Sequence, residues 1–263
     1  MIYRIEHTQT AAYLFQHWNE TIIWSCLDRT MGSIYADDVQ DPGSSAAVLG
    51  DFCFLAGVPS RELVTFIQNR KAPDFDLDFL ILVPQTPQWQ ALIETCYGAN
   101  AKKVTRYAIR KEPDIFDIKK LHQAISSLSS GYSMKLIDEE IYHLCQKEEW
   151  SRDLVSRFPD YPAYRKLGLG AAVFYKDTLV SGASSYSRYQ NGIEIEIDTR
   201  KEFRQKGLAY ACGARLILEC LARNLYPSWD AQNKISVALA EKLGYHYDHE
   251  YTAYEIRNFP LKK

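Results

Sequence analysis

Residues 193–209 read Ile193-Glu-Ile-Glu-Ile-Asp-Thr-Arg-Lys-Glu-Phe-Arg-Gln-Lys-Gly-Leu-Ala209. The first six residues alternate between apolar and polar side chains, which predicts a β-strand with one apolar face. A basic turn follows, and Gly207 comes just before a helical pattern. Glycine lets the backbone approach an anion closely, and the first turn of a helix presents N–H groups that have no partner within the helix. The stretch therefore predicts a strand, a phosphate-binding turn and a helix.

The residues after Gly207 support this interpretation. Apolar side chains recur at the 3-3-4-3-4 spacing of an amphipathic helix suited to packing on a sheet, at Leu208, Ala211, Ala214, Leu218, Leu221 and Leu225. A short strand-like segment over 225–229 comes next. Asn233 then opens a second helix, which ends in Lys242-Leu-Gly-Tyr245.

The pattern Arg204-x-x-Gly207-x-Ala209 resembles the Arg/Gln-x-x-Gly-x-Gly/Ala motif with which GNAT acetyltransferases hold the pyrophosphate of acetyl-CoA. The run from Asn233 to Tyr245 resembles the superfamily as well. A closer similarity is to a two-domain Gram-positive group of the superfamily that includes the zwittermicin A resistance acetyltransferase. It rests on Ile197-Asp-Thr199, Arg204-Gln-Lys-Gly-Leu-Ala209, Trp229-Asp-Ala-Gln-Asn233 and Ser236-Val-Ala-Leu-Ala-Glu-Lys-Leu-Gly-Tyr245, about the last quarter of the chain.

The expected fold class is α/β with a mixed sheet. A small polar stretch, Ser126 to Gly131, is the best linker candidate, so the sequence predicts an accessory α/β domain over 1–128 and a GNAT acetyltransferase domain over 129–263. The resemblance implies that the first domain is a degenerate GNAT-like fold. Within it we expect helices over 8–31 and 60–69 and from Thr86 onward, and strands over 46–56, 77–83 and 103–109.

The resemblance also implies which residues bind acetyl-CoA. Backbone groups of Ile197, Asp198 and Thr199 would pair with the pantetheine arm, and one amide would polarise the acetyl carbonyl. The pyrophosphate would be held by the turn and the helix start, at Arg204, Gln205, Lys206, Gly207, Leu208 and Ala209. Asn233 would cap its helix and reach the cofactor near the pantetheine. An ordinary tight turn at Gly207 is the alternative.

Proton transfer has candidates on the same strand. Alternation places Glu194, Glu196 and Asp198 on one side, where mutual repulsion would raise the pKa of at least one carboxyl group. Glu196 is the first candidate base, because superfamily members often have a glutamate there, and Glu194 is the second. A solvated strand face is the alternative for each acid.

The usual general acid of the superfamily is absent. Many members carry a tyrosine seven residues after the asparagine, where this chain has Ala240. Ser236, one turn earlier on the same helix, is a candidate substitute, although packing or helix capping explains a serine there equally well.

Composition restricts the partners. The net charge of −2, from 31 basic and 33 acidic residues without a long basic run, argues against a nucleic-acid partner. No apolar run approaches the ~18 residues that span a bilayer, and no targeting segment is evident, so we expect a cytoplasmic protein without a membrane partner. The cysteines lack paired spacing and the histidines lack ligand spacing, so no metal is expected. The oligomeric state cannot be deduced from the sequence.

These observations predict an acetyl-CoA-dependent N-acetyltransferase that acts on the amine of a small molecule, an antibiotic or a metabolite, by direct transfer in a ternary complex. A small acceptor is preferred because a cleft between two domains would suit a compact ligand. Two alternatives remain. Ala240 is compatible with a non-catalytic CoA-binding regulatory module, and paired GNAT-like domains also occur in aminoacyl-tRNA-dependent transferases, which the near-neutral charge disfavours.

Overall fold

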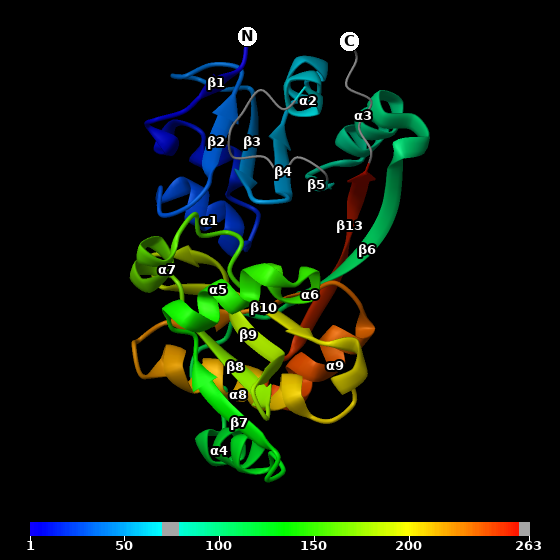
Figure 1. The fold of residues 1–263 in the computed structure, drawn as a ribbon. Helices are drawn as coiled ribbons and strands as arrows, with labels where there is room; N and C mark the ends of the chain where they lie inside the picture. The colour runs from blue at the N-terminus through cyan, green and yellow to red at the C-terminus, as the bar shows by residue number, and fades with distance from the viewer. Residues whose placement is uncertain (70–78, 258–263) are drawn as a thin grey trace. The chain divides into compact units, whose positions relative to one another are not determined.

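The computed structural model, drawn as a ribbon in Figure 1, describes residues 1–69 and 79–257. Contacts divide the chain into two compact units. Unit 1 consists of Met1–Arg106 together with the C-terminal segment from Glu250, and unit 2 of Tyr107–His249. Two strands, β6 (Ala101–Ile109) and β13 (Tyr247–Arg257), run from one unit into the other. Both units mix helices with sheets, which confirms the expected α/β class.

Unit 1 is built on a mixed sheet whose strand order is β1-β2-β3-β4-β5-β13-β6-β12. The pairs from β1 to β4 are antiparallel, β4 and β5 are parallel, and β13 is antiparallel to β5. Its last strand, β12, belongs to unit 2 and pairs with the end of β6. The strands are β1 (Tyr3–Arg4), β2 (Ser33–Ala36), β3 (Ser44–Leu49), β4 (Phe52–Gly57), β5 (Phe79–Pro84) and β12 (Asp230–Ala231).

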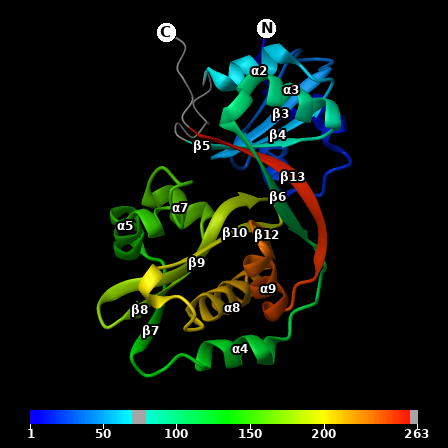
Figure 2. The ribbon, with the colours of Figure 1, turned by 90° about the vertical axis from the view of Figure 1, so that its right-hand side faces the viewer.

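Helices α2 (Arg61–Gln68) and α3 (Pro87–Tyr97) cover one face of this sheet, and Figure 2 shows both in front of β3 and β4. Leu63 and Ile67 of α2 and Trp89 of α3 pack into the same core as the strand residues. Both helices begin where the sequence predicts, because Ser60 and Thr86 accept hydrogen bonds from backbone amides three residues later.

Two expectations for unit 1 are corrected. The helix predicted over 8–31 is interrupted, and consists of the 3-10 turns η1 (Thr8–Thr10) and η2 (Ala12–Phe15) followed by α1 (Thr21–Leu27). The strand predicted over 46–56 is a hairpin, because Gly50 adopts a positive φ of 60° and reverses the chain between β3 and β4. The strand expected from Leu77 begins at Phe79 as described, and its first two positions lie outside the described residues.

Unit 2 contains a five-stranded sheet of order β11-β10-β9-β8-β7. All its neighbours are antiparallel except β10 and β11, which are parallel. The strands are β7 (Tyr132–Leu136), β8 (Gly170–Tyr175), β9 (Thr178–Tyr189), β10 (Gly192–Thr199) and β11 (Tyr226–Ser228). β10 and β11 lie within one residue of the strands predicted over 193–199 and 225–229, as secondary-structure ends commonly do.

Helices cover both faces of this sheet, as Figure 2 shows. On one face, α8 (Leu208–Leu221) packs with α4 (Ile118–Ser126) and α9 (Lys234–Leu243) against apolar strand residues. On the other face lie α5 (Glu139–Lys147), α6 (Glu149–Arg152) and α7 (Tyr161–Leu167). On that face Tyr164 of α7 hydrogen-bonds Ser184 of β9 at 2.8 Å.

The compact units divide the chain differently from the expected 128/129 boundary. Leu121 and Ala124 of α4 are buried in the core that also contains Leu216 and Ile217 of α8, so the helix before the polar linker belongs with the residues after it. At the other end, β13 pairs with β5 over Tyr254–Arg257 and contributes its last residues to unit 1. A single boundary along the sequence places α4 and the end of β13 in the wrong units, because each packs with residues on the other side of that boundary.

The two units repeat one arrangement. In unit 1, the antiparallel strands β2, β3 and β4 lead through α2 to β5, which lies parallel to β4. In unit 2, β8, β9 and β10 lead through α8 to β11, which lies parallel to β10. This supports the GNAT-like first domain that the resemblance implies, although the sequence shows no visible repeat.

Candidate active site

The central strand of unit 2 forms a fork with its neighbour. β10 pairs with β9 from Gly192 to Thr199, but it pairs with β11 only from Gly192 to Glu194. The last parallel pair is Glu194 with Ser228. Beyond Trp229 the chain turns away, and β12 pairs with β6. Within the described chain, the edge of β10 after Glu194 therefore has a neighbouring strand on the β9 side only.

The two faces of β10 differ as the alternation predicts. Ile193 and Ile195 are buried in the core with Leu208 and Cys212 of α8, and Ile197 packs against that core. Glu194, Glu196 and Asp198 therefore lie on the opposite face. Of these acids Glu194 is buried, with 7% of its surface exposed, whereas Glu196 and Asp198 are half-buried.

The loop after β10 leads into α8 with its backbone amides available. Gln205 and Gly207 have positive φ values of 61° and 77°, and Gly207 stands at the N-cap of α8. Among the described residues, none accepts a hydrogen bond from the backbone N–H groups of 205–210. A Cβ atom built on Gly207 would meet no atom within 4 Å, so the space beside this glycine is open. An oxyanion such as a pyrophosphate fits a helix start of this kind.

Arg204 holds this loop against the end of β10. Its Nε donates a hydrogen bond to the carbonyl oxygen of Thr199 at 3.0 Å, and one terminal nitrogen lies 3.5 Å from Oδ1 of Asp198. The arginine and the next three residues are exposed. Lys206 lies over the ring of Phe203, with Nζ 4.6 Å from the ring centre, and adds a second positive charge to the loop.

Asp198 has a structural function in the same corner. Its Oδ1 accepts a hydrogen bond from the Thr199 amide at 2.6 Å. Burial raises the pKa of this carboxyl group, and Asp153 adds to the effect, while Arg204 and the Thr199 amide oppose it. The sequence predicts a raised pKa on this strand from repulsion within the row of acids. For Asp198 the principal cause is instead desolvation.

The second motif helix, α9, begins as predicted. Oδ1 of Asn233 accepts hydrogen bonds from the amides of Ile235 and Ser236, both at 3.0 Å. Ala240 is fully buried in the core, so the position of the usual tyrosine is filled by packing. Ser236 accepts a hydrogen bond from the indole nitrogen of Trp229 at 3.0 Å. That contact gives Ser236 a structural role that the sequence could not show.

Two serines that the sequence analysis did not identify stand beside Glu194. Ser187 of β9 and Ser228 of β11 are its direct partners on either side. Both serines are buried, with 0% and 1% of their surface exposed, and neither hydroxyl has a hydrogen-bond partner among the described residues. Cross-strand register brings them together, and without the register nothing in the sequence relates them.

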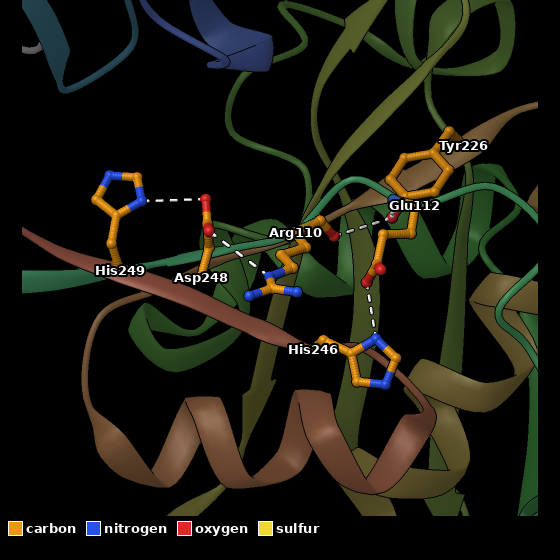
Figure 3. Close-up of polar contacts among 6 residues, drawn as sticks. All are labelled: Arg110, Glu112, Tyr226, His246, Asp248 and His249. Atoms are coloured by element: carbon orange, nitrogen blue, oxygen red, sulfur yellow. Dashed lines mark hydrogen bonds and ion pairs between the residues drawn. The ribbon is translucent and has the colours of Figure 1, made fainter.

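The histidines near the start of β13 each have a carboxylate partner, as Figure 3 shows. Nδ1 of His246 lies 2.7 Å from Glu112, and Nδ1 of His249 lies 3.0 Å from Asp248. The Tyr226 hydroxyl, whose pKa burial raises to about 12, accepts a hydrogen bond from the Glu112 amide. In the described ranges, no group of three His, Cys, Asp or Glu side chains is arranged to hold a metal ion.

No described helix combines the length and the hydropathy that crossing a membrane requires. Helix length and apolarity therefore give no indication of a membrane span in residues 1–69 and 79–257.

Comparison with known proteins agrees with this geometry. The profile of the GNAT acetyltransferase family matches residues 12–254. An uncharacterized N-acetyltransferase of Bacillus subtilis, YdfB, is 31% identical over 251 residues, which cover 89% of each chain. The crystal structure of a GCN5-related N-acetyltransferase-like protein from Streptococcus suis is 48% identical, with a TM-score of 0.88 over 96% of this chain and 99% of that one.

A more distant structure shows the fold alone. A tandem GNAT protein from the clavulanic acid biosynthesis pathway is 10% identical, with a TM-score of 0.52 over 98% of each chain. The family profile and the two closer relatives, together with the fork and the loop of unit 2, establish the identity. The chain belongs to the GNAT acetyltransferase family and is an acyltransferase.

Proposed function

We propose that this enzyme is an acetyl-CoA-dependent N-acetyltransferase that transfers the acetyl group directly to the amine of a small molecule in a ternary complex. One observation carries the cofactor assignment. The amides of 205–210 have no acceptor among the described residues, and they lie beside the open space at Gly207 and the charges of Arg204 and Lys206. This combination suits a pyrophosphate better than an ordinary turn, which would use its amides internally.

The fork supports the position of the rest of the cofactor. From Ile195 to Thr199, the described part of the chain places no strand beside β10 on the β11 side, and this edge leads from Glu194 to the proposed pyrophosphate site. Backbone groups of Ile197, Asp198 and Thr199 on this edge would pair with the pantetheine arm, and an amide there would polarise the thioester carbonyl. Acetyl-CoA supplies an activated acetyl group with a thiolate leaving group. Asn233 caps α9, and a contact with the pantetheine remains part of the proposal.

The acidic face of β10 would accept the proton that the amine loses. Glu196 and Glu194 are the candidates, because both lie on the face of β10 opposite the isoleucines that pack on α8. A positioned carboxylate contributes about 10²- to 10⁴-fold to such a step. Ser236, the candidate acid, accepts a hydrogen bond from Trp229, which leaves its own proton free to point elsewhere.

The acceptor substrate, the partners and the cellular location remain proposals. A positively charged small amine is compatible with the acidic face of β10. The net charge of −2 argues against binding to the phosphate backbone of a nucleic acid. We also retain a cytoplasmic location and the absence of a membrane partner as predictions. A non-catalytic CoA-binding module is not favoured, because the family and the named relatives are acetyltransferases.

Calorimetry with acetyl-CoA, followed by a thiol-release assay across a panel of small amines, tests the proposal. We expect saturable binding of one cofactor to unit 2 and acetyl-CoA-dependent thiol release with at least one amine. Binding without release for any amine would favour the binding module. No binding of acetyl-CoA would contradict the proposed function itself.

A further inference from the structure

We infer that Arg200 is a positioning residue, which holds the segment over residues 148–154 on the acidic face of β10 and links it to the turn over residues 200–207. We call these two stretches the acceptor segment and the cofactor turn. The inference rests on the proposed function. It adds to that proposal a residue that acts on the acceptor through an ion pair with Glu148.

The acceptor segment lies on the same face of the sheet as the acids of β10. Leu154 is fully buried, and a Cβ atom built on Gly182 would lie 2.6 Å from its Cδ1 atom. Gly182 is the direct cross-strand partner of Asp198, and direct partners in a sheet point to the same face. Burial raises the pKa of Asp198, and the nearby charge of Asp153 adds to that effect. The segment therefore lies against the face where the proposed function places the acceptor.

Glu148 begins the acceptor segment. It lies between α5 and α6 in an extended conformation, with φ −115° and ψ 142°. Its Oε2 accepts a hydrogen bond from the indole nitrogen of Trp150 at 2.8 Å, and its Oε1 lies 3.6 Å from a terminal nitrogen of Arg200. The carboxylate thus connects the start of α6 with the residue that follows β10.

Arg200 connects this carboxylate with the cofactor turn. Its Nε lies 3.5 Å from Oε2 of Glu202, and its carbonyl oxygen accepts a hydrogen bond from the amide of Phe203 at 2.8 Å. Its own amide donates to the carbonyl oxygen of Val180 at 2.9 Å, which fixes its backbone on β9. A planar guanidinium group has donors on several sides, so one arginine can hold two carboxylates at once.

The strength of such ion pairs limits the size of the effect. The side chains of Arg200, Glu148 and Glu202 are partly exposed, and an exposed ion pair typically shifts an equilibrium by less than about five-fold. Arg200 is therefore expected to change acceptor binding a few-fold. A loss of turnover by orders of magnitude would indicate a catalytic residue instead.

The position of Arg200 also couples the two stretches. The amides of 205–210 have no acceptor among the described residues, and Arg200 stands at the start of the same turn. A pyrophosphate bound to those amides would fix the turn, so less conformational freedom would be lost when Arg200 holds Glu148. By linkage, an amine that contacts the acceptor segment would favour acetyl-CoA binding by the same factor.

The test compares Arg200→Gln, Arg200→Lys, Glu148→Gln and the double variant of both glutamines with Lys201→Gln as a matched control. Lys201 lies in the same turn, is exposed, and forms no ion pair with a described residue. Lys201→Gln and Arg200→Gln remove the same charge from the cofactor turn, so only the link to Glu148 differs between them.

Hydrogen exchange of peptides that cover the acceptor segment is measured by mass spectrometry with and without acetyl-CoA. Without ligand, Arg200→Gln and Glu148→Gln should already exchange faster there than Lys201→Gln. Acetyl-CoA should slow this exchange about two- to five-fold in wild type and in Lys201→Gln. The slowing should vanish in Arg200→Gln and Glu148→Gln and return partly in Arg200→Lys, and the double variant should match the single ones.

Kinetics with the amine of the panel that has the highest turnover provides the second measurement. Arg200→Gln should raise KM for this amine about two- to five-fold relative to Lys201→Gln, with kcat nearly unchanged. Glu148→Gln should have the same effect, because it removes the other end of the ion pair.

Equal slowing of exchange in wild type and Arg200→Gln would overturn the inference and leave the proposed function standing. Faster exchange of the acceptor segment in wild type with acetyl-CoA would also overturn it, because the pyrophosphate would then draw Arg200 away from Glu148. A wild type that does not bind acetyl-CoA would contradict the proposed function and the coupling. The ligand-free comparison would still decide whether Arg200 holds the acceptor segment.

Discussion

Arg204 donates through Nε to the carbonyl oxygen of Thr199 at 3.0 Å, and this bond joins the loop before α8 to the end of β10. The guanidinium group thus fixes the position of the amides that we propose for the pyrophosphate, in addition to supplying charge. Lys206, two residues later, carries a charge without a comparable bond to the backbone in the described structure. Variants of these two residues can therefore separate two contributions to acetyl-CoA binding, the positioning of the loop by Arg204 and the positive charge of Lys206.

We predict that Arg204→Lys weakens acetyl-CoA binding by about ten-fold, because lysine keeps the charge but has no donor at the position of Nε. Lys206→Ala should also weaken binding, but its effect should shrink at high salt, since only screened charge is lost. Calorimetry at low and high salt measures both. Wild-type affinity in Arg204→Lys would show that the bond to Thr199 has no role in binding.

A second prediction concerns Trp229 and Ser236. Ser236→Ala should lower the free energy of unfolding by about 1–3 kcal/mol, because it leaves the buried indole N–H without an acceptor. The loss should largely disappear in a Trp229→Phe background, where that donor is absent. We expect kcat of Ser236→Ala to stay within a few-fold of wild type. A fall of kcat by ~10²-fold, with normal folding, would make Ser236 the general acid instead.

The pH dependence of stability provides a third prediction. Burial raises the pKa of Asp198, so the folded state binds this proton more tightly than the unfolded state does. The charged form therefore opposes folding, and stability falls as pH rises from the unfolded pKa through the higher folded pKa. Asp198→Asn, which keeps an acceptor for the Thr199 amide, should be more stable than wild type at neutral pH and should lose that advantage in acid.

Asp38 is the control, because its pKa is shifted in the direction opposite to that of Asp198. Hydrogen bonds from the amides of Asp41 and Gln40 lower the pKa of its carboxyl group, so its charged form favours folding. Asp38→Asn should be less stable than wild type at neutral pH, and the difference should vanish as pH falls through the folded pKa. Thermal unfolding across pH 3 to 8 compares both variants. Equal pH profiles for the two would contradict these assignments.

The sequence predicts unit 2 well, because its signals are local. The alternation of 193–199, the glycine before α8 and the cap at Asn233 all depend on neighbouring residues, and each appears where expected. The prediction of one helix over 8–31 was wrong, because apolar residues at helical spacing also suit short 3-10 turns. The prediction of one strand over 46–56 was wrong, because two short buried strands joined at Gly50 have the same apolar pattern as a single long one.

Features set by long-range pairing could not be predicted. The exchange of β13 into the sheet of unit 1 and the packing of α4 on α8 depend on contacts far apart in sequence. The row of Ser187, Glu194 and Ser228 depends on strand register and on an irregularity between β9 and β10 beside Glu194. Shifting a strand by one residue reverses its faces, so the neighbours of a site residue follow only from the structure.

The central claim, that the turn before α8 binds acetyl-CoA, is tested most directly at Gly207. Gly244 is the matched control, because it also has a positive φ, 113°, at the end of α9, and a Cβ atom there would make only ordinary contacts. Calorimetry with acetyl-CoA on Gly207→Ala and Gly244→Ala compares two variants that each place a Cβ atom at a positive φ. We predict at least ten-fold weaker binding in Gly207→Ala and near wild-type binding in Gly244→Ala. Equal affinity of both folded variants for acetyl-CoA would contradict the site.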